Sequence, residues 1–173
     1  IAGQGGIKVE TRISGRVWKY GDDVNTDVIF PGKYTYSIFD RKEMAEHALE
    51  DLDPDFVANV QPGDIIVAGK NWGCGSSREQ AVICLVEAGV GAIIARSFAR
   101  IYFRNSINEG LPIVTCDAVA SVETGDEVTI DFEAGVVTPP GAEYSCPPLA
   151  PSVMEILDAG GLVPHVKKKL GIE

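Results

Sequence analysis

The sequence has no run of 18 apolar residues, so no segment is long enough to span a membrane as a helix. No secretory signal peptide is recognisable, and no C-x-x-C pair occurs among Cys74, Cys84, Cys116 and Cys146. The wide spacing of these cysteines excludes zinc-ribbon and paired redox motifs. A chain of this size needs no disulfides, so we expect four free thiols in a reducing compartment, the cytoplasm.

Basic residues are scarce, with 15 Lys and Arg against 25 Asp and Glu, which gives a formal net charge of −10. That charge repels phosphate backbones and anionic lipids, so we expect neither nucleic-acid nor membrane partners. The chain has 173 residues and 45% hydrophobic residues, an ordinary globular composition that excludes a disordered protein. We set residues 1–6 aside as a remnant or flexible start and expect residues 7–173 to form a single domain.

The apolar pattern predicts strands that alternate with helices. Strands are expected at 12–19, 65–68, 91–95 and 112–116, and helices at 41–50, from Ser76 or Ser77 to near 89, from Ser97 to about 108, and from 151 to 160. This order indicates an α/β fold with a mostly parallel sheet flanked by helices. Residues 127–132 and 136–138 predict an added antiparallel hairpin. We interpret Lys167–Lys169 as a solvated basic tail.

The segment from Asn71 to Ala81 joins a predicted strand to a predicted helix and has the sequence Asn-Trp-Gly-Cys-Gly-Ser-Ser-Arg-Glu-Gln-Ala. Ligands of open α/β sheets bind at this edge, and a helix start favours anions. Gly75 allows close approach of the backbone to a ligand, and Arg78 offers a bidentate fork for a carboxylate or phosphate. The alternative is an ordinary helix cap with Ser76 as its capping residue.

Several standard motifs are incomplete in this segment. Gly73-x-Gly75-x-x-Arg78 lacks the third glycine of the dinucleotide fingerprint, and Asn71 follows Lys70 where a P-loop needs Ser or Thr. The G-x-S-x-G elbow of α/β hydrolases is also missing. An anion site of another type therefore remains as the functional interpretation.

Three ordered motifs resemble the swivelling domain of the aconitase superfamily. They are Gly-Arg-Val-Trp-Lys at 15–19 with Asp-Val-Ile at 27–29, then Gly-Cys-Gly-Ser-Ser-Arg-Glu at 73–79, and then Ser-Phe-Ala-Arg-Ile-Tyr-Phe-Arg-Asn-Ser at 97–106 with Asn-Glu-Gly-Leu-Pro at 108–112. As separate chains, such domains are the small subunits of 3-isopropylmalate dehydratase and homoaconitase. The resemblance is strong over roughly residues 12–116 and implies a swivelling β/β/α domain.

The resemblance also implies roles for individual residues. Ser76 matches the catalytic base, which removes a proton from the carbon next to a carboxylate. Ser77 and Arg78 match groups that hold a substrate carboxylate. Asp27 matches an acid of the family that can orient these groups, although an ordinary turn aspartate is the alternative.

The family's Lewis acid is a [4Fe–4S] cluster on the large subunit, which implies no metal on this chain and a large-subunit partner. We therefore expect a hydro-lyase subunit that is inactive alone. The expected partner surface comprises residues 31–39 and 97–108. We expect the loop 31–39 to be mobile without the partner.

The loop that contains Lys33, Thr35 and Tyr36 is where relatives select their substrate, a small dicarboxylate. Homoaconitase-type chains place an arginine at the position of Tyr36. An uncharged ring suits a branched apolar group, so we expect conversion of 2-isopropylmalate to 3-isopropylmalate by dehydration and rehydration, a step of leucine biosynthesis. Dimethylmalate, citramalate or homoaconitate, the last with Lys33 in place of the arginine, is the alternative. A stand-alone carboxylate-binding or regulatory module and an RNA-binding role are hypotheses from other classes.

Overall fold

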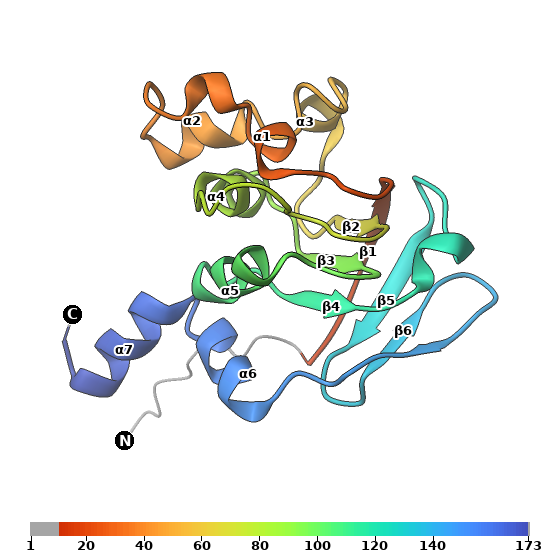
Figure 1. Cartoon of the computed structure of the whole chain (residues 1–173). Coiled ribbons are helices and arrows are strands. Elements are labelled where there is room, and N and C mark those ends of the chain that lie inside the picture. Colours follow the sequence, from red (N-terminus) through yellow and green to blue (C-terminus); the bar gives the residue numbers. More distant parts are fainter. Residues whose placement is uncertain (1–10, 173) are drawn as a thin grey trace.

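A computed structural model describes residues 11–172; the expectation for residues 1–6 lies outside this range. Figure 1 shows the arrangement of the elements. In chain order they are β1 (Arg12–Lys19), α1 (Thr26–Ile29), the 3₁₀ turn η1 (Gly32–Tyr34), α2 (Arg41–Ala45), α3 (Phe56–Asn59), β2 (Ile65–Ala68), α4 (Gln80–Glu87), β3 (Ala92–Ala95), α5 (Arg100–Asn108), β4 (Ile113–Thr115), the 3₁₀ turn η2 (Ala118–Ser121), β5 (Glu127–Asp131), β6 (Val136–Thr138), β7 (Tyr144–Ser145), α6 (Pro151–Asp158) and α7 (Leu162–Leu170). Within the described range, every helix is too short or too polar to cross a bilayer.

The strands form one seven-stranded sheet in the order β4-β3-β2-β1-β5-β6-β7. β1 to β4 pair in parallel, with Val17 opposite Ile65 and Ile65 opposite Ala92. β5 pairs antiparallel with β1, and β6 and β7 continue that half of the sheet. The expected α/β fold with flanking helices and a hairpin is therefore confirmed, and the hairpin extends the sheet directly through β1.

Apolar side chains fill both faces of the parallel strands, which explains their continuous hydrophobic sequence. Ile66 and Ile93 belong to the core beneath α4 and α5, whereas their neighbours Ile65 and Ile94 belong to the core on the opposite face. In Figure 1, α4 and α5 lie side by side on one side of the sheet, with α1 to α3 beyond α4. This layering leaves the carboxyl ends of the strands free to carry loops.

Two predicted helices begin later than the sequence suggests. α4 starts at Gln80 with no side-chain capping bond, because residues before it pair with the loop after β1. α5 starts at Arg100, and the hydroxyl of Ser97 accepts a hydrogen bond from the backbone of Asn71 at 2.8 Å instead of capping the helix. The alternative interpretation of Ser76 as a helix cap was therefore wrong, and Ser97 does not cap α5.

The helix predicted at 41–50, α2 in the structure, is shorter than expected. Asp40 caps α2 as expected and accepts from the backbone nitrogen of Glu43 at 3.0 Å, but α2 ends at Ala45. Leu49 has a φ of 58°, which an α-helix does not allow, and its backbone nitrogen donates to the carbonyl of Ile29 at 2.8 Å. Burial of Leu49 against α1 thus replaces the last helical turns.

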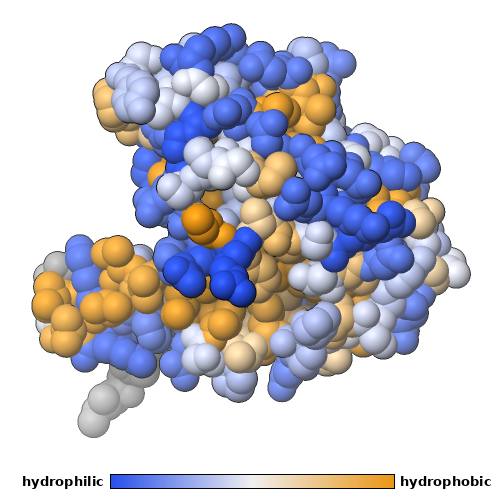
Figure 2. Space-filling model, viewed as in Figure 1, coloured by the Kyte–Doolittle hydropathy of each residue, from blue (hydrophilic) through white to orange (hydrophobic). Residues whose placement is uncertain are grey.

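The basic tail expected at Lys167–Lys169 is part of a helix, α7, which the sequence analysis missed. Gly160 and Gly161 have positive φ values and separate α7 from α6. The apolar side chains of α7 are largely exposed and give it the hydrophobic surface at the lower left of Figure 2. Leu162, Val166 and Leu170 recur at helical spacing, but the lysine run was interpreted by itself.

Candidate active site

Three loops meet at the carboxyl end of the parallel strands. The loop after β2, residues 69–79, lies between the loops after β1 and β3 and forms backbone hydrogen bonds with both. Gly73 N donates to Val24 O at 2.8 Å, and Trp72 N donates to Ser97 O at 3.1 Å. This pairing fixes the backbone of the segment that contains Ser76, at the sheet edge where open α/β folds bind ligands.

Ser76 lies on this loop with its side chain exposed and its hydroxyl in two hydrogen bonds. Ser76 Oγ is 3.0 Å from Thr26 Oγ1, and it accepts from Arg78 Nε at 2.8 Å. The backbone nitrogen of Ser76 also donates to Thr26 Oγ1 at 3.0 Å. Sequence reasoning missed Thr26, although it stands beside the singled-out Asp27, because nothing in the sequence relates positions fifty residues apart.

Arg78 gathers the predicted site residues around one guanidinium group. Its Nη1 donates to Thr35 Oγ1 and its Nη2 donates to Asp27 Oδ1. The Arg78 side chain is 17% exposed and that of Asp27 is 69% exposed, so the ion pair lies at the rim of the site. Burial lowers the pKa of Arg78 from its ordinary value, yet a guanidinium remains cationic in proteins.

Gly75 and Ser77 flank the Ser76 position. Gly75 has a φ of 107°, and a Cβ there would lie 3.1 Å from Thr26 Oγ1, so the glycine permits the turn and the close approach. Ser77 has an exposed side chain, and its carbonyl accepts from Asn105 Nδ2 of α5 at 3.1 Å. The Ser77 hydroxyl therefore faces an open surface where a ligand has access.

The predicted specificity loop is joined to the same group. Thr35 binds Arg78 through its hydroxyl, and its carbonyl accepts from Gln80 Nε2 at 3.0 Å. Tyr36 is 90% exposed, and Phe39 is 73% exposed. The base of the loop is thus held, while the side chains of Tyr36 and Phe39 are exposed to solvent.

Lys33 lies apart from the Arg78 group. Its Nζ is 3.0 Å from Glu50 Oε1, and the same carboxylate accepts from Tyr34 Oη at 3.0 Å and lies 2.6 Å from His47 Nδ1. Burial opposes ionisation of Glu50, but the hydrogen bonds of His47, Lys33 and Tyr34 outweigh it and lower its pKa. The hydrogen bond to Glu50 raises the pKa of Lys33. Lys33 therefore anchors the loop to the turn after α2 in this structure.

Residues 11–172 contain no group of three or more His, Cys, Asp or Glu residues placed to hold a metal ion. Cys84 and Cys116 are buried, and burial raises the pKa of both thiols, which disfavours the thiolate that iron requires. The cysteines of the described residues are therefore not placed to bind an iron–sulfur cluster.

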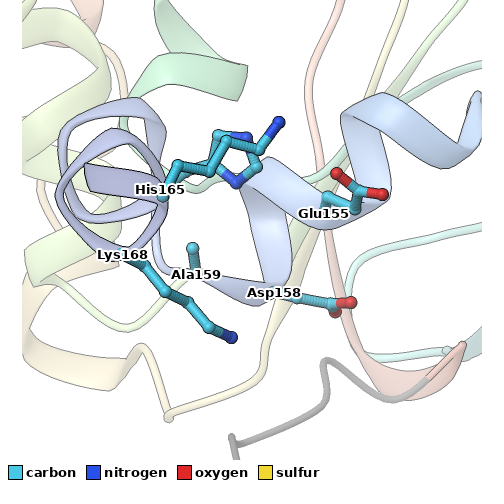
Figure 3. A pocket seen from close by; sticks show the side chains of 6 residues that line it. Glu155, Asp158, Ala159, His165 and Lys168 are labelled. Carbon is cyan, nitrogen blue, oxygen red and sulfur yellow. The ribbon is translucent and has the colours of Figure 1, made fainter. Parts of the chain in front are cut away.

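A pocket of about 370 Å³ lies between α6 and α7 and is shown in Figure 3. Glu155 and Asp158 of α6 and His165 and Lys168 of α7 contribute to its walls. These walls mix acids and bases and include none of the predicted site residues. The predicted site residues therefore lie outside this pocket, in the open group around Ser76 and Arg78.

Comparisons with known proteins identify the family of the chain. Residues 28–118 match the family described as the aconitase C-terminal domain. The chain is 46% identical over 165 residues to the 3-isopropylmalate dehydratase small subunit of Thermodesulfovibrio yellowstonii, which covers 94% of this chain and 98% of that protein. It is 49% identical over 164 residues to the methanogen homoaconitase small subunit of Methanothermobacter thermautotrophicus, with 94% and 95% covered.

A solved structure is also similar. The crystal structure of a 3-isopropylmalate dehydratase from Methanocaldococcus jannaschii matches with a TM-score of 0.86 and 43% identity. The match covers 92% of this chain and 95% of that one.

Proposed function

The chain belongs to the family of 3-isopropylmalate dehydratase small subunits, and we propose that it performs the proton-transfer half of that reaction. Together with a large subunit, it would convert 2-isopropylmalate to 3-isopropylmalate through isopropylmaleate. The observation that carries this proposal is the hydrogen bond from Arg78 Nε to an exposed Ser76 hydroxyl.

Ser76 is the proposed base. In the dehydration step its Oγ takes the proton from the carbon next to a carboxylate, the C–H electron pair becomes the carbon–carbon double bond, and the substrate hydroxyl leaves. In rehydration Ser76 gives the proton to the carbon that lost the hydroxyl, and the hydroxyl adds to the carbon that lost the proton. The donated hydrogen bond of Arg78 supports this role because donors aimed at an oxygen stabilise its anion, most strongly where water is excluded.

Arg78 and Ser77 are the proposed carboxylate clamp. Asp27 and Thr35 accept from the fork of Arg78 and hold the guanidinium beside Ser76, where its remaining N–H groups can bind a substrate carboxylate. Asp27 would orient the guanidinium, and Gly75 would let the backbone approach the substrate. Bidentate binding fixes the C–H bond relative to Ser76.

The large subunit is proposed to supply a [4Fe–4S] cluster as the Lewis acid for the leaving hydroxyl. The poor fit of this chain's own cysteines to such a cluster supports that division of labour. Since the base and the Lewis acid would then lie on different chains, we propose that this chain is inactive alone. The four free thiols fit a reducing compartment, which supports a cytoplasmic location.

The large subunit is proposed to cover the face formed by the loop 31–39 and α5. Tyr36 and Phe39 are strongly exposed there, and Ile101 of α5 is also exposed. α5 reaches the Ser76 loop through the hydrogen bond from Asn105 to Ser77. Contact on this face would close the open site and exclude water from Ser76.

An anaerobic assay of the reconstituted complex tests this function. The complex would be offered isopropylmaleate, cis-homoaconitate and dimethylmaleate side by side. We expect preference for isopropylmaleate, loss of activity in Ser76→Ala, and no turnover by the chain alone. Preference for cis-homoaconitate, the substrate type suggested by the Methanothermobacter relative's name, would overturn the assignment of Tyr36. Turnover without the large subunit would overturn the shared site.

A further inference from the structure

We propose that Thr26 is a positioning residue that donates a hydrogen bond to Ser76 Oγ once Ser76 has lost its proton. This inference rests on the proposed function of Ser76 as the base. It assigns a role to a residue outside the set that binds substrate. Thr26 would act through Ser76 and would never contact the reacting carbon.

The position of Thr26 is fixed by the backbone. Thr26 is the first residue of α1, is 1% exposed, and its nitrogen donates to the carbonyl of Cys74 at 2.8 Å. The loops after β1 and β2 are therefore joined beside the hydroxyl. The β-branched side chain of threonine has a restricted χ1, so the hydroxyl has little freedom to turn away.

The donors and acceptors define the direction of these bonds. The backbone nitrogen of Ser76 is a donor, so Thr26 Oγ1 accepts from it at 3.0 Å. Arg78 Nε is also a donor, so Ser76 Oγ accepts from it at 2.8 Å. In the neutral serine, either hydroxyl can donate across the 3.0 Å contact between Thr26 and Ser76. An ionised Ser76 has no proton, so Thr26 must then be the donor.

Ionised Ser76 would consequently receive two hydrogen bonds from fixed donors, one cationic and one buried. Within residues 11–172, both hydrogen bonds of the Thr26 hydroxyl go to Ser76, so no other acceptor competes for its proton. Gly75 makes this approach feasible, because a side chain there would crowd Thr26 Oγ1. Donors that are already in place when charge develops stabilise it without reorganisation.

Thr26→Val, which keeps the shape and removes the hydroxyl, tests the proposal in the reconstituted complex. We expect kcat to fall roughly 100- to 1,000-fold, as for the loss of one oxyanion donor, with KM changed less than about threefold. The acid limb of the pH profile should move to higher pH, because the base would be harder to ionise. Thr26→Ser keeps the donor and should recover most of kcat.

Controls separate this role from a purely structural one. Thr129→Val makes the same substitution on β5, where Thr129 Oγ1 lies 2.7 Å from Ser14 Oγ, and should leave kcat and the pH profile unchanged. Thermal unfolding of each variant reports folding. Three outcomes would overturn the role of Thr26 and leave the proposed function intact. They are wild-type kcat in Thr26→Val, an unchanged pH profile in Thr26→Val, and a Thr26→Ser variant as impaired as Thr26→Val. A wild-type complex without turnover would overturn the proposed function and this inference with it.

Discussion

Gln80 Nε2 donates to the carbonyl of Thr35 at 3.0 Å and so joins the first residue of α4 to the loop proposed to select the substrate. The hydroxyl of the same Thr35 accepts from Arg78. The side chains that hold the loop therefore emerge from the segment that carries Ser76. In the proposed mechanism, substrate selection and proton transfer would therefore share one support.

Replacing Ser76 with alanine should remove the base without disturbing the fold. We expect kcat of the reconstituted complex to fall by roughly 100- to 10,000-fold, the usual contribution of general base catalysis. The melting temperature should change little because the side chain is exposed. Ser77→Ala is the matched control, and we expect it to raise KM more than it lowers kcat. Equal kcat values for the two variants would contradict the assignment of the base.

Arg78→Lys should retain the charge but lose the fork. A lysine cannot serve Ser76, Thr35 and Asp27 together. Since charge-assisted hydrogen bonds contribute about 1.5–3 kcal/mol, we expect kcat/KM to fall roughly 10- to 100-fold. Steady-state kinetics on isopropylmaleate would measure the loss. An Arg78→Lys complex with full activity would show that point charge alone suffices.

Tyr36→Arg should shift substrate preference toward an additional carboxylate. Tyr36 is 90% exposed, so the arginine can be accommodated without repacking. We expect the ratio of kcat/KM for cis-homoaconitate over isopropylmaleate to rise by about tenfold or more. Tyr36→Phe, which keeps the ring, serves as the control and should retain the wild-type preference. An unchanged ratio in Tyr36→Arg would place specificity elsewhere, for example on the large subunit.

Phe39→Asp should weaken binding of the large subunit. Phe39 is 73% exposed on the proposed contact face, and exposed aromatic side chains often dominate interfaces. We expect Kd to rise roughly 10- to 100-fold in a titration monitored by calorimetry. Val163→Asp on α7 makes the same change at an exposed apolar position outside that face and should leave Kd within about threefold. The reverse pattern would move the interface to α7.

Asp64 should make the fold sensitive to acid. Burial opposes its ionisation, but Arg16 at 2.8 Å, the backbone nitrogen of Gln61 at 2.9 Å and Trp18 Nε1 at 2.8 Å all donate to it and lower its pKa. The folded carboxylate therefore holds its proton less tightly than the unfolded one. Its stabilisation is present above the ordinary pKa near 3.8 and is lost as the pH falls toward the lower folded value.

Asp64→Asn should therefore destabilise the chain by about 1–3 kcal/mol at neutral pH and flatten the dependence of stability on pH below about 4. Urea unfolding at a series of pH values would measure both effects. Glu133→Gln changes an exposed carboxylate in the hairpin turn and should leave the curve unaltered. A variant whose stability falls with acid as steeply as the wild type would assign the acid sensitivity to other groups.

The sequence predicted the elements whose side chains are buried on a regular pattern. β1 and β2 have the predicted bounds, and Pro151 opens α6 as expected, because apolar periodicity and proline act locally. The start of α4 was predicted too early because the Ser76 segment pairs with a distant loop, which no local signal reports. α7 was missed although its apolar residues follow helical spacing, because Lys167–Lys169 was interpreted as a solvated tail.

The candidate site was predicted only in part, because local sequence signals do not report which loops pair in the fold. The structure brings Asp27, Thr35, Ser76 and Arg78 together, as the motifs indicated. Lys33 pairs with Glu50 instead, and the contribution of Thr26 depends on its three-dimensional contact with Ser76. Motif spacing identifies residue types, whereas side-chain partners are decided by the pairing of loops.

The hydrogen bond between Thr26 and Ser76 joins positions 50 residues apart, and that between Arg78 and Asp27 joins positions 51 apart. Pairing of β1 with β2, which sets Val17 opposite Ile65, brings the same two segments together, so the sheet contributes to offsetting the loop-closure entropy of these contacts. The geometry of the site therefore depends on the sheet that holds the two loops together. A nascent or partly unfolded chain carries every residue of the site but holds none of them in place.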